Sequence, residues 1–311
     1  MRSRTEGSGQ RPAASGQGPE ASVQAFRGTG IRDLVSLLRT GLCALASLLL
    51  LAEPAHAQRG GRFPRGMEFM GALGDDNSYF TPPDFNGNPK YDGRFIFARI
   101  KYRGFGRYSF REGPGWSHDY PRADSHFMRI MGTITSMHPF IEEGPILGST
   151  ILGFDDAELF KYPVAYLSEP VAWHPTNSEV LGLRKYLEKG GFVIFDDFRI
   201  DSRDEDMANF VQTMAKVLPQ YKVLPLPPSH PIFDSFFRID FNQLRSGRLS
   251  NNGEFYAVFR DNDPTKRIMA VINFNQDIGD YWQWSDRGFN VVPTNEAYKL
   301  GVNYMIYALT H

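Results

Sequence analysis

The chain has 311 residues, and its 34 Lys and Arg residues nearly balance its 35 Asp and Glu residues. This balance argues against a nucleic-acid-binding protein, because such proteins carry an excess of basic residues that neutralises phosphates. With 41% hydrophobic and 22% charged residues, the composition is that of a globular protein rather than a disordered one. The single cysteine excludes a disulfide scaffold and any metal site built from several thiolates.

The N-terminal segment has the features of an export signal. Residues 1–30 are rich in Gly, Ser, Gln, Arg and Pro, and a basic flank then precedes an apolar run at residues 41–52. The Ala-His-Ala sequence at residues 55–57 matches a signal-peptidase site. We therefore expect a signal peptide over residues 1–57, cleaved near Ala57, and a periplasmic or secreted protein. Twelve apolar residues are fewer than the ~20 that span a bilayer, so membrane attachment would require an uncleaved anchor.

Removal of residues 1–57 has two consequences for the mature chain. It would leave 254 residues with 28 Lys and Arg and 31 Asp and Glu, a net charge of −3. It would also remove Cys43, so the exported protein would have no thiol and no cysteine nucleophile. Residues 58–90 are dense in Gly, Pro, Asn and Asp, which predicts a flexible linker. The remaining residues, 91–311, form the predicted domain.

Strand and helix patterns alternate from residue 91 onward. The apolar residues of the predicted helices recur at helical spacing, and Thr176 and Glu179 form a capping box at the start of one of them. The run Phe-Val-Ile-Phe at residues 192–195 is typical of a strand that is buried on both faces. The predicted strands are residues 95–102, 162–167, 192–195, 221–226, 255–260 and 268–274. The predicted helices are residues 121–135, 176–189, about 207–218 and 295–309.

This alternation favours a parallel sheet covered by helices on both faces, because short crossover connections keep successive strands parallel. About 220 residues suit one domain of that kind. The sequence shows no internal repeat. We therefore expect an α/β fold, a flavodoxin-like three-layer sandwich with a mostly parallel sheet.

Four segments of the predicted domain together resemble one bacterial family, domain of unknown function 4159. They read WSHDYPRADSHF, EKGGFVIFDDF, HPIFDSFF and NFNQDIGDYWQW, and they begin at residues 116, 188, 230 and 273. The similarity covers about residues 91–311. In addition, the block LGLRKYLEKGGFVIF, which starts at residue 181, looks like the class I glutamine amidotransferase-like fold. The resemblance implies a fold rather than an activity.

The chain departs from working amidotransferases at the nucleophile. Those enzymes place a nucleophilic cysteine on a sharp turn after a strand, whereas the mature chain has no cysteine and no Gly-x-Ser-x-Gly elbow. Glutaminase chemistry is therefore excluded. The sequence also contains no His-Glu-x-x-His, Walker A or Gly-x-Gly-x-x-Gly motif, so nothing in it supports a zinc protease or a nucleotide-binding protein.

Asp196 and Asp197 directly follow the predicted buried strand at residues 192–195. In open α/β sheets, ligands bind beyond the carboxyl ends of the strands. Either carboxylate is therefore a candidate ligand of a hard metal ion or a candidate general base. The alternative is that the two residues end the strand, cap the next loop or pair with Arg199.

The start of the predicted helix at residues 121–135 is crowded with charged residues. Arg122, His126 and Arg129 lie at i, i+4 and i+7, and such a basic stripe near a helix start could bind an anion. The alternative is a solvated helix face. The preceding Ser-His-Asp at residues 117–119 is not a catalytic triad, because contiguous residues cannot align as nucleophile, base and orienting acid.

His230 precedes a proline and resembles a His-Pro element found in amidotransferase-like relatives involved in sugar metabolism. The residue before proline is held extended, so the imidazole could point into the crevice as a general acid. The alternative is a loop histidine satisfied by local hydrogen bonds. Two other His-Pro pairs, at residues 138–139 and 174–175, show that the pattern is common in this chain.

Asn273, Asn275, Asp277 and Trp282 combine oxygen ligands with an aromatic ring. Such groups suit the binding of a sugar or of Ca²⁺, although the spacing lacks the central Gly and terminal Glu of an EF-hand. The alternative is that the polar residues close a turn while the tryptophan packs on the sheet. Asp197 and Asp277 are the candidate metal ligands.

These candidates leave two functions open. The first is a non-catalytic exported binding or scaffold module that takes an unknown protein partner or a small ligand. The second is a metal-dependent or carboxylate- and histidine-dependent hydrolase acting on carbohydrate or cell-envelope substrates. Its residues would be Asp196 or Asp197 as base or ligand, His230 as acid and Asp277 as second ligand, and these must converge within roughly 10 Å. The sequence identifies no cofactor but leaves room for a divalent cation, and the lack of an enzyme motif favours the first function.

Overall fold

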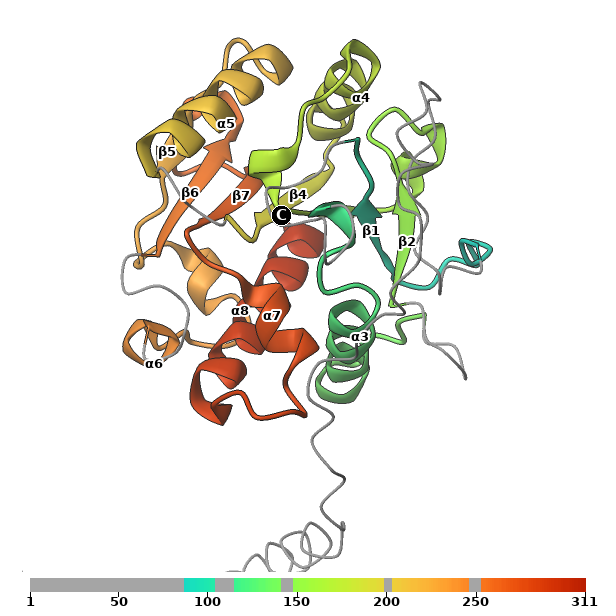
Figure 1. The fold of residues 1–311 in the computed structure, drawn as a ribbon, viewed down its shortest axis with the longest axis vertical. Helices are drawn as coiled ribbons and strands as arrows, with labels where there is room; N and C mark the ends of the chain where they lie inside the picture. The colour runs from blue at the N-terminus through green and yellow to red at the C-terminus, as the bar shows by residue number, and fades with distance from the viewer. Residues whose placement is uncertain (1–86, 104–114, 141–147, 199–202, 246–252) are drawn as a thin grey trace, which may run out of the picture. The chain divides into compact units, whose positions relative to one another are not determined.

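A computed structural model describes residues 87–103, 115–140, 148–198, 203–245 and 253–311 (Figure 1). The predicted signal peptide and nearly all of the predicted linker lie outside these residues. The chain divides into two units, Met1–Gly74 and Asp75–His311, and the described residues all belong to the second. Among them, no helix combines the length and the apolar character needed to cross a membrane.

The second unit is built on a seven-stranded sheet with the order β2-β1-β3-β4-β7-β6-β5. The first five strands in that order run parallel, whereas β6 is antiparallel to both β7 and β5. The mostly parallel α/β sheet expected from the sequence is therefore confirmed. The strands are β1 Phe97–Ile100, β2 Ser149–Leu152, β3 Val164–Ser168, β4 Phe192–Asp196, β5 Val223–Pro225, β6 Glu254–Phe259 and β7 Ile268–Phe274.

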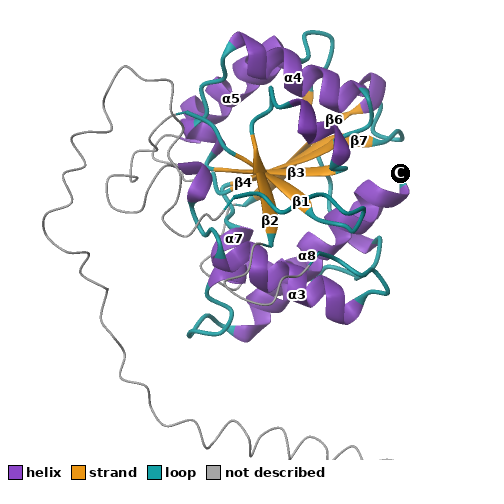
Figure 2. Cartoon of the chain, turned by 90° about the vertical axis from the view of Figure 1, so that its right-hand side faces the viewer, coloured by secondary structure: helices purple, strands orange, loops and turns teal. Residues whose placement is uncertain are grey.

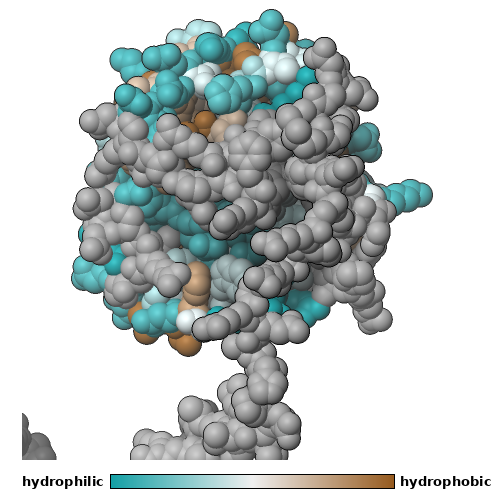
Figure 3. All heavy atoms as spheres, viewed as in Figure 1, coloured by the Kyte–Doolittle hydropathy of each residue, from teal (hydrophilic) through white to brown (hydrophobic). Residues whose placement is uncertain are grey.

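Helices cover both faces of this sheet. Figure 2 shows α4 and α5 on one side of the strands and α3, α7 and α8 on the other. On the face shown in Figure 3, the described surface is mostly hydrophilic and carries only small hydrophobic patches. The helices are α3 Arg122–Ile134, α4 Asn177–Glu188, α5 Arg203–Val217, α6 Phe241–Arg245, α7 Ile278–Gln283 and α8 Val291–Thr310.

The start of α4 forms as the sequence predicts. The amide of Glu179 donates to Thr176 Oγ1 at 3.3 Å, and the amide of Thr176 donates to Glu179 Oε2 at 2.7 Å. The two residues therefore satisfy amides that the first turn of a helix leaves without partners. The chain then leaves the helix through Gly190, whose φ of 105° suits glycine. This connection carries the chain into β4, which is buried along its whole length.

Close packing of aromatic rings joins α3, α7 and α8. The rings of Phe127 and Trp282 are stacked with their centroids 4.3 Å apart, and the Trp282 Nε1 donates to the carbonyl of Ala297 at 3.1 Å. Gly301 of α8 lies directly against these rings, since a Cβ there would fall 2.4 Å from the Trp282 ring and 2.7 Å from the Phe127 ring. The approach of α8 to α7 thus depends on a missing side chain.

We expect Gly301→Ala to destabilise the protein by about 1–3 kcal/mol, because the added methyl overpacks a rigid aromatic layer. Alanine favours a helix over glycine by about 1 kcal/mol, so the clash must exceed that gain. Urea unfolding followed by tryptophan fluorescence measures the change. A variant as stable as the wild type, or more stable, would show that the layer can adjust.

Candidate metal centre

Four polar side chains converge at the carboxyl edge of the parallel strands. His118 and Asp119 lie between β1 and α3, Asp197 follows β4, and Asp277 follows β7. One nitrogen of the histidine and one oxygen of each carboxylate all lie within 4.8 Å of one another. We refer to these four residues as the carboxyl-edge cluster. The sequence placed Asp197 at this edge and named Asp277 as a second candidate metal ligand, whereas His118 and Asp119 were missed as ligands.

The backbone around the cluster adopts left-handed conformations that non-glycine residues rarely take. The φ angle is 64° at Asp119 and 60° at Asp197, and it is 50° at Glu169 and 55° at Asn275. The last three of these residues each closely follow the end of a parallel strand. Such residues cost about 1–3 kcal/mol each and collect at functional sites. The carboxyl edge therefore stores strain where its polar side chains meet.

His118 is held between two carboxylates. Its Nδ1 lies 2.8 Å from Asp197 Oδ2 and 3.4 Å from Asp119 Oδ2. Burial alone would lower the pKa of His118, but the negative charges of Asp119 and Asp197 outweigh it and raise that pKa well above its usual range. In the absence of a bound cation, the imidazolium is therefore the positive charge that faces these acids.

Asp119 has an unusual environment for a buried carboxylate. Its side chain is 0% exposed, and neither of its oxygens accepts a hydrogen bond within the part of the chain that the structure describes. The His118 nitrogen lies 3.4 Å from its Oδ2. Buried polar groups almost always have hydrogen-bond partners, because leaving water without them costs free energy. Asp119 is therefore the member of the cluster that most needs a further ligand.

Asp277 is oriented by the helix that follows it. Its Oδ1 accepts a hydrogen bond from the amide of Asp280 at 2.8 Å, which makes it the N-cap of α7. Burial raises the pKa of Asp277 well above its usual value, and the charges of Asp197 and Asp119 raise it further. This mutual repulsion among the acids means that a positive charge placed between them would be strongly stabilised.

Asp196 serves as a structural anchor beside the cluster. Its carboxylate accepts hydrogen bonds from Tyr166 Oη at 2.6 Å, Asn273 Nδ2 at 2.8 Å and the amides of Ile278 and Gly279 at 3.0 and 3.1 Å. Burial raises the pKa of Asp196 to about 7, while the bonds from Tyr166 and Asn273 oppose that rise. Since its donors tie β3, β4, β7 and α7 together, we assign Asp196 a role in holding the site rather than in its chemistry.

Of the predicted ligand-binding residues in and after β7, only Asp277 belongs to the cluster. Asn273 is buried, and its Oδ1 accepts a hydrogen bond from Tyr304 at 2.8 Å. Trp282 is fully buried in the aromatic layer described above, as the packing alternative expected. Asn275 is half-buried at the strained turn after β7. Asn273 and Trp282 therefore make contacts that support the fold.

Two residues of the predicted basic stripe on α3, Arg122 and His126, form polar contacts with a neighbouring part of the fold. Arg122 forms an ion pair with Asp286 and lies 5.4 Å from the centroid of the Trp284 ring. His126 Nδ1 donates to the carbonyl of Trp282 at 2.8 Å. Both side chains thus connect α3 to residues in and after α7, and these contacts favour a structural role for Arg122 and His126 over the candidate anion site.

His230 lies far from the cluster. Its Nδ1 accepts a hydrogen bond from the amide of Ile232 at 3.2 Å, and its ring packs against Phe259. Phe259 pairs with Ile268, the first residue of β7, whereas Asp277 comes after the last residue of that strand. The structure thus corrects the expectation that His230 converges with the acids. The alternative of a locally satisfied loop histidine describes it instead.

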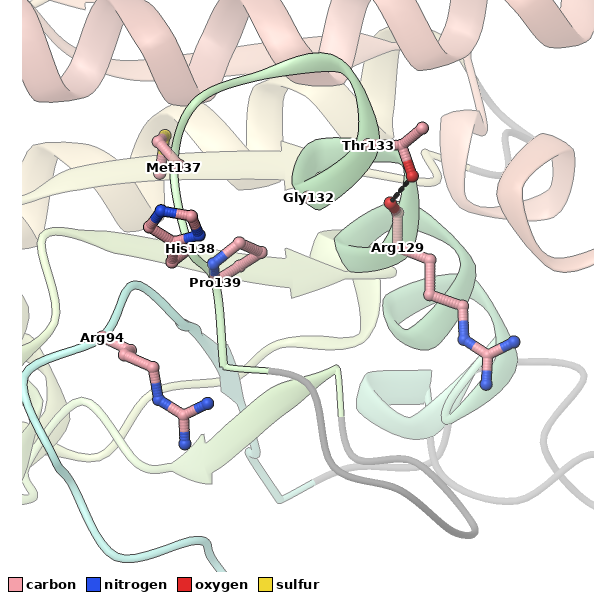
Figure 4. A pocket seen from close by; sticks show the side chains of 7 residues that line it. All are labelled: Arg94, Arg129, Gly132, Thr133, Met137, His138 and Pro139. Atoms are coloured by element: carbon pink, nitrogen blue, oxygen red, sulfur yellow. Dashed lines mark hydrogen bonds between the residues drawn. The ribbon is translucent and has the colours of Figure 1, made fainter.

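One pocket of about 570 Å³ lies at the other edge of the sheet, where α3 ends and the chain enters β1. Figure 4 shows that the guanidinium groups of Arg94 and Arg129 are well separated and do not point toward each other. Arg94 is also held by Asp92 at 2.6 Å. The pocket therefore lacks converging polar groups. It is lined by Arg94, Arg129, Gly132, Thr133, Met137, His138 and Pro139.

Comparison with known protein families identifies a family for most of the described residues. The model of a family described as domain of unknown function, DUF4159, matches residues 96–309. This range includes every residue of the carboxyl-edge cluster and all seven strands. No curated protein matches the chain.

Proposed function

The chain belongs to the DUF4159 family, and we propose that it binds a divalent cation at the carboxyl-edge cluster and uses it to hydrolyse a carbohydrate or cell-envelope substrate. Because His230 does not converge with the acids, this hydrolase would act through the cation and the residues of the cluster, with His118 as its histidine, and not through His230. The observation that carries this proposal is the buried carboxylate of Asp119, which accepts no hydrogen bond from the described residues. A cation would supply both the positive charge and the coordination that this carboxylate requires.

The donor set suits a divalent ion. Three carboxylates and one imidazole match the ligands of Mn²⁺ or Zn²⁺, while Ca²⁺ and Mg²⁺ prefer oxygen alone. The 2.8 Å between His118 Nδ1 and Asp197 Oδ2 resembles the separation of neighbouring ligands around an ion at about 2.0–2.2 Å. One divalent ion would leave the cluster with a single net negative charge once His118 is neutral. The site would therefore favour an uncharged substrate group over a phosphate.

The position of the cluster also supports a role in catalysis. In open α/β sheets, ligands bind where the strand order reverses, at the carboxyl ends of the strands. In the order β2-β1-β3-β4-β7, β2 lies on one side of β1 and β3 lies on the other, so the strand order reverses at β1. This order supports the finer proposal of a flavodoxin-like three-layer sandwich related to the amidotransferase-like fold. When bound at such an edge, a divalent cation lowers the pKa of a coordinated water and polarises a substrate oxygen.

A non-catalytic binding module is the second candidate. It is favoured by the absence, from residues 58–311, of any cysteine and of any Gly-x-Ser-x-Gly sequence. Such a module would use the same cation to hold a small ligand or a protein partner. The features of residues 1–57 support export in either case, so we propose that the protein acts in the periplasm or outside the cell.

The test has two stages. First, thermal unfolding of the chain is measured in chelator and with Mn²⁺, Zn²⁺, Mg²⁺ or Ca²⁺. A site-specific cation at 100 times its dissociation constant should raise the midpoint by about 5–10 °C. Second, the stabilising cation is added to assays with ester, amide, glycoside and phosphoester substrates. Turnover of an uncharged substrate supports the hydrolase, and cation binding without turnover supports the binding module. No shift with any of the four ions contradicts both.

A further inference from the structure

A buried polar unit formed by Arg99, Asp124 and Ser149 adjoins the segment that carries two of the cluster's ligands. We propose that Arg99 is a positioning residue that holds His118 and Asp119 in place for cation binding. This inference rests on the proposed function, because it assigns a residue that prepares the same site. Neither Arg99 nor Asp124 was a candidate site residue in the sequence.

One side of the Arg99 guanidinium is fixed by a carboxylate. Arg99 lies in β1 and is 0% exposed. Its Nε donates to Asp124 Oδ2 at 2.8 Å, and its Nη2 donates to Asp124 Oδ1. Ser149 Oγ, at the start of β2, also donates to Asp124. The two-pronged contact sets the plane of the guanidinium, since two parallel hydrogen bonds leave it little freedom to turn.

The remaining side of the guanidinium binds the backbone next to the cluster. Arg99 Nη1 donates to the carbonyl of Trp116 at 3.1 Å and to the carbonyl of His118 at 3.0 Å. These carbonyls flank the turn that leads into Asp119, where φ is 64°. A strained left-handed residue persists only when its surroundings determine its conformation. Arg99 supplies two of the contacts that determine it.

Arg99 is also unable to act as an anion clamp. All three of its guanidinium nitrogens donate hydrogen bonds, and its Cζ lies 4.9 Å from the centroid of the Tyr166 ring. Burial would lower the pKa of Arg99, but the charge of Asp124 outweighs it, so the guanidinium stays charged. That charge is balanced by Asp124. The acids of the cluster therefore keep their own excess of negative charge for a cation.

Replacing the whole polar unit distinguishes a purely structural ion pair from a positioning residue, because only the loss of a positioning residue should weaken cation binding. Replacing a buried ion pair by apolar residues of similar volume is often neutral or stabilising, whereas removing one partner leaves a buried charge. The variant Arg99→Met/Asp124→Leu/Ser149→Ala removes the whole polar unit together. The three apolar side chains fill a similar volume, but the variant loses both hydrogen bonds to the carbonyls of Trp116 and His118.

The experiment compares Mn²⁺ binding by the full chain with urea unfolding in chelator. We expect the triple variant to unfold cooperatively while its dissociation constant for Mn²⁺ rises on the order of 10–100-fold, as when residues that orient metal ligands are removed. Arg122→Met is the matched control, because it removes a neighbouring arginine that contacts Asp286 instead of this turn. It should bind Mn²⁺ as the wild type does. A triple variant with wild-type affinity overturns the inference.

Two further measurements keep the inference testable. If the triple variant does not fold, Arg99→Lys retains the charge but cannot reach the carboxylate and both carbonyls at once, and it should also lose Mn²⁺ affinity. The imidazole resonances of His118, assigned with His118→Gln, are recorded in chelator and report its position without any metal. Unchanged His118 resonances in the variants overturn the inference even if the wild type binds no cation. Displaced resonances support it whether or not the proposed function holds.

Discussion

We expect the Asp119→Asn variant to lose cation binding and yet to be more stable than the wild type when no cation is present. The Asp119 carboxylate is buried, accepts no hydrogen bond from the described residues and shares the imidazolium of His118 with Asp197, so the excess negative charge destabilises the folded chain. Asparagine has nearly the same shape, and it tolerates the φ of 64° found at this position. The substitution therefore removes a charge without demanding a new backbone conformation.

Affinity for the stabilising cation should fall by about 100-fold or more, because a charged ligand that faces the ion is lost. In chelator, the free energy of unfolding should rise by about 1–3 kcal/mol. Urea unfolding and a cation titration measure the two effects on the same samples. Asp234→Asn provides the control, since Asp234 is exposed. A variant that is less stable than the wild type in chelator would mean that the carboxylate stabilises the fold, and the cation proposal would fail.

Gly279→Ala should weaken cation binding through a steric effect on Asp119. A Cβ at this position would fall 2.5 Å from Asp119 Oδ2 and 2.9 Å from Tyr166 Oη. Glycine is therefore required where α7 approaches the cluster. The added methyl must displace the carboxylate or the phenol, and we expect affinity to fall about 10-fold or more, with a loss of about 1–3 kcal/mol in stability.

The matched control for this variant is Gly301→Ala, which also adds a methyl group to a crowded helix. Its clash involves the rings of Trp282 and Phe127 and not a ligand of the cluster. It should lower stability by a similar amount while the dissociation constant of the cation stays unchanged. Equal losses of affinity in the two variants would show that overall destabilisation, and not the displacement of Asp119, weakens binding.

Much of the fold could be predicted from the sequence because its main elements carry strong local patterns. The capping box of α4 and the apolar run of β4 both form where expected. By contrast, β2 was not predicted, because Ser149–Leu152 is only four residues long and begins with two polar residues. Ser149 is buried there because its hydroxyl donates to Asp124, a contact between distant residues that no periodicity can reveal.

Two of the four residues of the carboxyl-edge cluster could be predicted from the sequence, for a topological reason. Asp197 and Asp277 could be placed at the carboxyl edge because each closely follows an apolar strand. His118 and Asp119 lie many residues after β1, and as contiguous residues they were rejected as parts of a catalytic triad and not weighed as metal ligands. The misplacement of His230 has a similar cause. Leu226 pairs with Phe255, but His230 packs against Phe259, so the chain runs back along β6 toward the other edge.

The left-handed backbone at the carboxyl edge also constrains how this protein can change by mutation. Asp119 and Asp197 occupy conformations that asparagine and glycine accept and that most other residues resist. A single-nucleotide change converts an aspartate codon into an asparagine codon, and it would remove a negative charge while preserving the turn. At Asp119, whose carboxylate accepts no hydrogen bond from the described residues, members of the family could therefore exchange cation binding for stability in one step without losing the fold. Sequences that carry asparagine at this position should encode folded proteins that have become indifferent to metal ions.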